Sequence, residues 1–197
     1  MTADIFPSTY AALLFAAVII LWALTELIGG TIIPWLRRRG TKVQRRNRGS
    51  NTLVILGWVA MFGFSASFAG SEIALLPSWV YYVGIALMLL GIAVRQWAIA
   101  VLGRYFSGVI GVQKEQKVVE TGPYRLVRHP SYTGALLILV GIGLAVQSWG
   151  AALVAVIIFG LVYGYRMLAE EKVLTSELGN SYVEYMERTK RILPFLL

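Results

Sequence analysis

Residues 132–165 read YTGALLILVGIGLAVQSWGAALVAVIIFGLVYGY, 34 positions without a charged side chain. A membrane-spanning helix needs about 20 mostly apolar residues. This stretch is therefore too long for one span and just long enough for two short ones. Its central polar break, Gln147-Ser148-Trp149-Gly150, predicts the turn between them. The stretch thus predicts a hairpin of two transmembrane helices.

Three further apolar stretches lie earlier in the chain, at Tyr10–Ile28, Leu53–Ala69 and Trp79–Leu102. The first has no basic residues ahead of it and, at 19 residues, is too long for a cleaved signal peptide. The 197-residue chain is 57% hydrophobic and only 14% charged, with a mean hydropathy of +0.69. Soluble domains are about 45–50% apolar and about 25% charged. We therefore predict an all-α integral membrane protein with five transmembrane helices.

Lysine and arginine are concentrated in three segments outside these stretches: 37–48, 103–131 and the residues after 165. Segment 37–48 alone carries seven basic residues and no acidic one. Cytoplasmic loops are enriched in Lys and Arg, and with five spans all three segments fall on one side. We expect the N-terminus outside and the C-terminus inside. Because segment 37–48 has no interleaved aromatic residues, we expect it to meet membrane lipids and not nucleic acid.

The chain contains no cysteine and a single histidine, His129. This composition excludes disulfides, iron–sulfur clusters, Cys/His zinc sites and a cysteine nucleophile. We therefore predict a site without a metal ion. Glu26, near the end of the first span, is expected to be interfacial or paired rather than catalytic.

The segment 120–134, ETGPYRLVRHPSYTG, differs from the rest of the chain. Pro130 suits the first turn of a helix that enters the bilayer, and the N-terminus of that helix suits a carboxylate or phosphate. Tyr124, His129 and Tyr132 are polar aromatic residues, which suit a flat or cationic ligand. The alternative is an ordinary belt of aromatic and basic residues at the membrane interface.

Arg166 and Glu170 lie four residues apart, so on a helix they share a face. They stand at the inner end of the fifth span, level with His129. Ionisable residues at this depth are functional candidates, although a surface ion pair that reaches toward water is the alternative. The next residues, Met167–Thr189, predict an amphipathic helix that lies along the membrane face and closes the site above it, with Pro194 ending the segment.

These motifs together resemble the isoprenylcysteine carboxyl methyltransferase family, and most of all its short prokaryotic five-span members. The resemblance covers residues 95–194, whereas the first two spans carry no motif. We therefore expect two anchoring helices and a basic loop in 1–78, and the catalytic core in 79–197. The shared patterns are Gly122-Pro123-Tyr124, Arg128-His129-Pro130-Ser131-Tyr132-x-Gly134, Arg166-x-x-x-Glu170-Glu171 and Leu178-Gly179-x-x-Tyr182-x-x-Tyr185.

The resemblance implies an S-adenosylmethionine-dependent enzyme that methylates the carboxylate of a lipophilic, isoprenylcysteine-like substrate and releases S-adenosylhomocysteine. The site then lies on the cytosolic face of a prokaryotic cell membrane, under the C-terminal helix. Arg166 and Glu170 are implied to be catalytic, with Arg166 and Arg95 on the substrate and Glu170 beside the amino group of the methyl donor. The other implied donor contacts are Gln113, a strand-like piece formed by Gln116, Lys117, Val118 and Val119, and then Tyr124, His129, Pro130, Ser131 and Tyr132.

The residue types fit this chemistry, because a carboxylate nucleophile is already ionised at neutral pH and needs no general base. Three alternatives stay open on the sequence alone. A phospholipid N-methyltransferase would share the fold, and an NADPH-dependent sterol-type reductase would share the pattern Arg-His-Pro-x-Tyr-x-Gly. A membrane scaffold or small transporter is the third, although the polar residues gather on one face and not at mid-bilayer, where transport sites lie.

Overall fold

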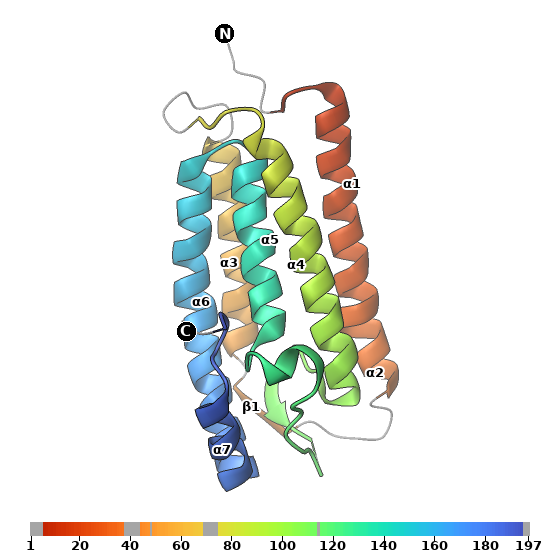
Figure 1. Cartoon of the computed structure of the whole chain (residues 1–197), viewed down its shortest axis with the longest axis vertical. Coiled ribbons are helices and arrows are strands. Elements are labelled where there is room, and N and C mark those ends of the chain that lie inside the picture. Colours follow the sequence, from red (N-terminus) through yellow and green to blue (C-terminus); the bar gives the residue numbers. More distant parts are fainter. Residues whose placement is uncertain (1–5, 38–43, 48, 69–74, 114, 195–197) are drawn as a thin grey trace.

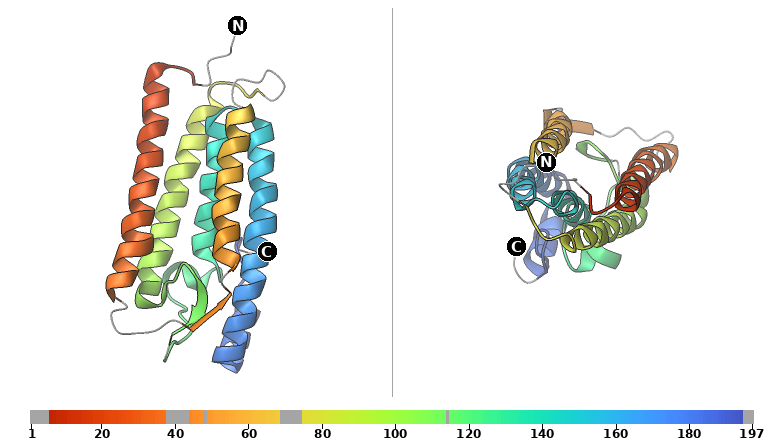
Figure 2. Two further views of the ribbon diagram at one scale, coloured as in Figure 1. Left: turned by 180° about the vertical axis from the view of Figure 1, so that it is seen from behind. Right: turned by 90° about the horizontal axis from the view of Figure 1, so that it is seen from above.

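The computed structural model describes residues 6–37, 44–47, 49–68, 75–113 and 115–194. Five long helices lie side by side in one bundle (Figure 1). They are packed as an arc in the order α1, α4, α5, α6, α3, which is seen from above in Figure 2. Their bounds are α1 (Thr9–Thr25), α3 (Gly49–Phe68), α4 (Val80–Leu102), α5 (Pro130–Ala145) and α6 (Trp149–Leu178).

Three helical stretches of the described chain are long and apolar enough to cross a membrane, namely Thr9–Arg37, Val80–Tyr105 and Trp149–Leu178. Two other apolar helices, Thr52–Phe68 and Pro130–Ala145, are shorter. At about 1.5 Å per residue, a helix of 16 residues extends for about 24 Å, less than the hydrocarbon core of about 30 Å. The outward faces of the bundle are rich in exposed Leu, Ile, Val and Trp side chains. The chain is an integral membrane protein.

The first helix runs further than the sequence predicts. It does not end near Ile28 but continues as a π-helix, η1 (Glu26–Ile32), and then as α2 (Ile33–Arg37). Gly29 and Gly30 lie within the π-helix and do not terminate it. A π-helix inserts an extra residue per turn and so changes which face of the helix the following residues occupy.

Helices α4 and α5 approach closely enough for their backbones to touch. A Cβ atom added at Gly91 would lie 2.6 Å from the Gly134 carbonyl oxygen, and one added at Gly134 would lie 2.6 Å from the Gly91 carbonyl oxygen. Small residues are what permits such a contact between membrane helices. This contact fixes the first turn of α5, which carries Ser131 and Tyr132, against α4.

The fold is mostly helical, but the prediction of an all-α protein is wrong in one respect. Strand β1 (Gln44–Asn47) pairs antiparallel with β2 (Ile110–Val112), with Arg45 opposite Gly111. The predicted strand-like piece at 116–119 has no strand structure, because the pairing falls a few residues earlier. Strand β1 lies in the basic segment 37–48, of which Arg38, Arg39, Lys42 and Arg48 are outside the described residues.

A turn joins α5 and α6 as predicted, but it ends at Ser148, because Trp149 and Gly150 already belong to α6. The Ser148 side chain caps α6 by accepting a hydrogen bond from the Ala151 amide. The predicted amphipathic helix at Met167–Thr189 is wrong in its bounds. Its first half belongs to α6, which runs unbroken for 30 residues, and only α7 (Asn180–Arg188) is separate. The break comes at Gly179, whose φ of 60° is the left-handed conformation that glycine adopts without cost.

Candidate active site

A cavity of about 290 Å³ lies at the end of the bundle that carries α7 and the β1–β2 pair. The predicted site residues converge on it from four separate parts of the chain. Of those residues, all but Gln113 and Pro130 line the cavity. The lining positions among them are Arg95, Gln116, Lys117, Val118, Val119, Tyr124, His129, Ser131, Tyr132, Arg166 and Glu170.

Tyr132 joins the two residues that the motifs marked as catalytic. Its hydroxyl accepts a hydrogen bond from Arg166 Nε at 2.8 Å and donates one to Glu170 Oε2 at 2.5 Å. Arg166 is only 5% exposed, and its Nη2 donates to the Gly108 carbonyl at 2.5 Å. The helical spacing of Arg166 and Glu170 thus places a cation and an anion on one wall of the cavity, both attached to the same hydroxyl.

The position of Tyr132 follows from the local sequence. Helix α5 begins at Pro130, as predicted, with His129 at the N-cap and Tyr132 in the first turn. The His129 ring stacks on the Tyr132 ring, with centroids 5.3 Å apart and planes 11° apart. Both residues line the cavity.

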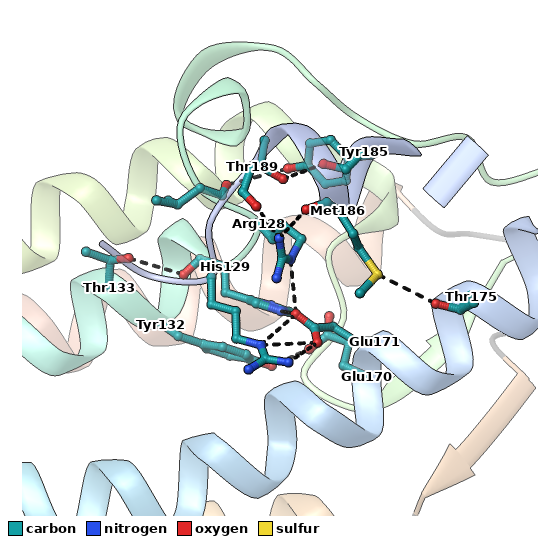
Figure 3. A network of polar contacts seen from close by, with 12 residues as sticks. Arg128, His129, Tyr132, Thr133, Glu170, Glu171, Thr175, Tyr185, Met186 and Thr189 are labelled. Carbon is teal, nitrogen blue, oxygen red and sulfur yellow. Dashed lines mark hydrogen bonds and ion pairs between the residues drawn. The ribbon is translucent and has the colours of Figure 1, made fainter. Parts of the chain in front are cut away.

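Glu171 does not line the cavity. Figure 3 shows its contacts beside those of its neighbour Glu170. Its carboxylate lies 3.3 Å from His129 Nε2, and it accepts hydrogen bonds from Arg128 Nε at 3.1 Å and from Arg191 Nη2 at 2.9 Å. A buried carboxylate is tolerated when it is paired in this way. The same contact raises the pKa of the Arg191 guanidinium. This network attaches the chain after α7 to the start of α5.

Backbone pairing strengthens this attachment. The Arg128 amide donates to the Lys190 carbonyl at 2.7 Å, and the His129 amide donates to the Arg191 carbonyl at 2.9 Å. In the sequence motif, Glu171 is only the second member of an acidic pair. Its partners are 43, 42 and 20 residues away along the chain, so no local pattern could have indicated its role.

Three tyrosines cover the cavity from the side of α7. Tyr124, Tyr182 and Tyr185 line it, and the Tyr185 hydroxyl donates to the Tyr124 carbonyl at 2.6 Å. Burial raises the pKa of all three hydroxyls above the ordinary value, so they remain neutral at physiological pH. Tyr182 and Tyr185 belonged to the quoted motifs but were not named as site residues; the motif itself was the signal that could have found them.

Arg95, predicted to contact substrate, is held by an acid from the first helix. Its Nη2 donates to Glu26 Oε2 at 2.8 Å, its Nε donates to Glu26 Oε1, and its Nη1 donates to the Ser131 carbonyl at 3.1 Å. The expectation that Glu26 is paired is confirmed. Both residues line the cavity. A ligand that contacts Arg95 there therefore meets a guanidinium whose charge is already balanced by the Glu26 carboxylate.

Gln113 and Pro130 are buried next to the site without lining it. The Gln113 side chain donates to the Arg104 carbonyl at 2.5 Å, and the Gln113 backbone amide donates to Gln116 Oε1 at 3.0 Å. It therefore shapes the loop that carries Gln116. Conversely, the cavity is lined by residues of the first two spans, which carry no motif: Trp22, Glu26, Val54 and Trp58.

Comparisons with known proteins bear on this site directly. The model of the isoprenylcysteine carboxyl methyltransferase (ICMT) family matches residues 84–176. Protein-S-isoprenylcysteine O-methyltransferase A of Arabidopsis thaliana is 32% identical over 133 residues, which are 64% of this chain and 68% of that protein. Protein-S-isoprenylcysteine O-methyltransferase B of the same plant is 32% identical over 120 residues, 60% of this chain and 61% of that protein, so the chain matches less than two thirds of its length.

A solved structure has the same fold. It is that of the eukaryotic intramembrane Ras methyltransferase ICMT, without a monobody, and it aligns with a TM-score of 0.68 over 97% of this chain and 70% of the solved chain, at 19% identity. The segment that the family model matches, residues 84–176, contains α5, most of α6 and the residues Tyr132, Arg166 and Glu170. The family predicted from the motifs is confirmed: the chain belongs to the isoprenylcysteine carboxyl methyltransferase family of membrane methyltransferases.

Proposed function

We propose that this chain transfers a methyl group from S-adenosylmethionine to the carboxylate of a lipophilic, isoprenylcysteine-like acceptor. The observation that carries this proposal is the Tyr132 hydroxyl, which holds Arg166 and Glu170 together at the cavity wall. The methyl donor is cationic at its ammonium and sulfonium groups, and the acceptor is an anion. A cation and an anion side by side suit this pair of ligands.

Each residue then has a separate task. Glu170 binds the donor ammonium, while the ring of Tyr124 lies beside the sulfonium, since aromatic faces attract cations. The bound donor supplies a methyl group activated by the positive sulfur. Arg166 holds and aims the acceptor carboxylate through charge-assisted hydrogen bonds. No general base is required because the nucleophile is already ionised, so the protein contributes position and electrostatics.

The acceptor tail extends into the apolar part of the cavity, away from Glu170. Trp22, Val54, Trp58 and Tyr163 line this part. Tyr163 precedes Glu170 by seven residues on α6, which corresponds to about 10 Å along the helix. In this proposal the five apolar helices span a prokaryotic cell membrane, the cavity opens on the cytosolic side, and α7 covers the donor.

Calorimetric titration of the detergent-purified chain tests the donor site, with S-adenosylhomocysteine as the probe and NADPH in parallel. We expect S-adenosylhomocysteine to bind, NADPH not to bind, and Glu170→Ala to abolish the signal. Glu177→Ala is the matched control, because Glu177 is an exposed acid on the same helix that does not line the cavity. Binding of NADPH alone would assign the chain to reductase chemistry and remove the role of Arg166.

The orientation is tested with single cysteines, for which the chain is suited because it has none of its own. Ser78→Cys and Glu187→Cys place one thiol at each end of the bundle, both at exposed positions. An impermeant maleimide added to intact cells should label Ser78→Cys at once and Glu187→Cys only after lysis. The reverse pattern would place the cavity on the outer side.

A further inference from the structure

The apolar end of the cavity is closed by one layer of three aromatic side chains. Trp22 on α1 and Trp58 on α3 stack with ring centroids 4.5 Å apart and planes 28° apart. Trp58 Nε1 donates a hydrogen bond to the Tyr163 hydroxyl on α6 at 3.0 Å. Because α1 and α3 are the two ends of the helical arc (Figure 2), this layer joins those ends across the cavity.

Side chains of the same three helices lie behind the layer. One helical turn further from Glu170 these helices place Val18, Phe62 and Phe159, and none of these lines the cavity. Val18 and Phe159 are buried, and the Phe159 ring stacks on Tyr163 at 4.8 Å. The Phe62 ring lies 6.2 Å from the Trp58 ring but is 38% exposed. The aromatic layer is therefore the floor of the cavity, with buried side chains behind it on α1 and α6.

The room above this floor is small. Pockets that hold drug-sized ligands have volumes of about 300–1,000 Å³, and here about 290 Å³ serves the donor and the end of the acceptor together. Trp58 both stacks on Trp22 and is hydrogen-bonded to Tyr163. With buried side chains behind them on α1 and α6, these rings do not move aside without cost, because protein interiors are close-packed. A tail that extends from a carboxylate at Arg166 therefore meets a fixed limit.

We propose that Trp22 and Trp58 are specificity-determining residues that set the longest hydrocarbon tail the acceptor can carry. This inference rests on the proposed methyl transfer to a lipophilic carboxylate and adds a selectivity to it. The native chain prefers short tails and loses efficiency as the tail grows. The selectivity resides in the first and third helices, outside the half of the chain that carries the motifs.

The test measures kcat/KM for methyl transfer from S-adenosylmethionine to three acceptors, the geranyl, farnesyl and geranylgeranyl thioethers of N-acetylcysteine, with the full chain in detergent. Trp58→Ala removes one of the three rings of the floor, and we expect the geranylgeranyl-to-geranyl ratio to rise at least about tenfold, the scale of discrimination for methylenes in a pocket. Trp22→Leu should raise the same ratio without removing the hydrogen bond to Tyr163. Trp22→Leu is the variant to measure if Trp58→Ala does not fold.

Phe64→Ala is the matched control, since Phe64 lies on the same helix as Trp58 but is exposed and does not line the cavity. The ratio in Phe64→Ala should equal that of the native chain. Retained methylation with an unchanged ratio in both tryptophan variants would overturn this inference, because the tail would then leave between helices into the lipid. No methylation of any of the three acceptors by the native chain would overturn the proposed function itself, and this inference with it.

Discussion

Two polar clusters lie next to each other at the same end of the bundle, and consecutive residues of one helix divide them. Glu170 belongs to the first and lines the cavity; Glu171 belongs to the second and does not. Successive residues of an α-helix point about 100° apart, so two adjacent carboxylates serve different neighbours. We name the first the donor-site cluster; it consists of Tyr132, Arg166 and Glu170. We name the second the C-terminal cluster; it consists of Arg128, His129, Glu171 and Arg191.

The clusters differ in how they satisfy their charges. Glu171 is paired within the protein, with guanidinium groups from Arg128 and Arg191 and the His129 ring around it. Glu170 instead accepts from a neutral hydroxyl, that of Tyr132. A carboxylate with a neutral partner still attracts a cationic ligand, whereas one that is already neutralised stabilises the fold. The comparison predicts that mutations of Arg166 and Glu170 affect catalysis, whereas mutations of Glu171 and Arg191 affect stability.

The largest effect is expected from Arg166→Gln. It removes the charge that aims the acceptor carboxylate but keeps a polar side chain, so kcat/KM for methyl transfer should fall about 10²–10³-fold, as when one electrostatic donor is removed from an active site. Radioactive methyl transfer to a prenylcysteine acceptor measures it. S-adenosylhomocysteine binding should persist in the variant. Near-native turnover would show that Arg166 belongs to the fold and not to the chemistry.

Glu171→Gln should give the largest loss of stability. It leaves the Arg128 guanidinium, whose side chain is 9% exposed, without its carboxylate, and breaking a buried pair costs about 3 kcal/mol or more. Thermal unfolding followed by tryptophan fluorescence should show a clearly lower Tm. Glu170→Gln is the matched comparison on the adjacent residue and should unfold near the native temperature. Equal losses of Tm in the two variants would show that the clusters do not differ in their contribution to stability.

Tyr132→Phe tests the link within the donor-site cluster. The ring and its stacking on His129 remain, but Arg166 and Glu170 lose their common hydroxyl. Hydrogen bonds to charged groups contribute about 1.5–3 kcal/mol, so we expect kcat/KM to fall by one to two orders of magnitude. Tm should change less than in Glu171→Gln. A variant that is unstable but fully active per folded molecule would count against the proposed arrangement.

The smallest effect is expected from Arg191→Ala. The Arg191 side chain is 43% exposed, so its pair with Glu171 is screened by water and contributes about 1 kcal/mol or less. The same unfolding measurement should therefore show a small decrease in Tm. The difference in Tm between the variant and the native chain should become smaller still at high salt, which screens the ion pair. A decrease as large as that of Glu171→Gln would mean that Arg191 supplies most of the stability that the C-terminal cluster contributes.

The sequence predicts the parts of this molecule that depend on local signals. The apolar hairpin, its turn at Gln147-Ser148, the start of α5 at Pro130 and the shared face of Arg166 and Glu170 all follow from spacing and from residue type. What it misses depends on contacts between distant residues. Arg45 pairs with Gly111 across 66 positions, and the Trp22–Trp58 stack joins helices that are not neighbours in the arc. Gly179 stops an otherwise helical pattern by a backbone conformation that hydrophobic periodicity does not report.

The backbone pairing of residues 190–191 with residues 128–129 also has a consequence for biosynthesis. The wall of the cavity at His129 is completed by chain made more than 60 residues later, after α5, α6 and α7. A nascent chain therefore cannot complete this wall until the residues after α7 have been made.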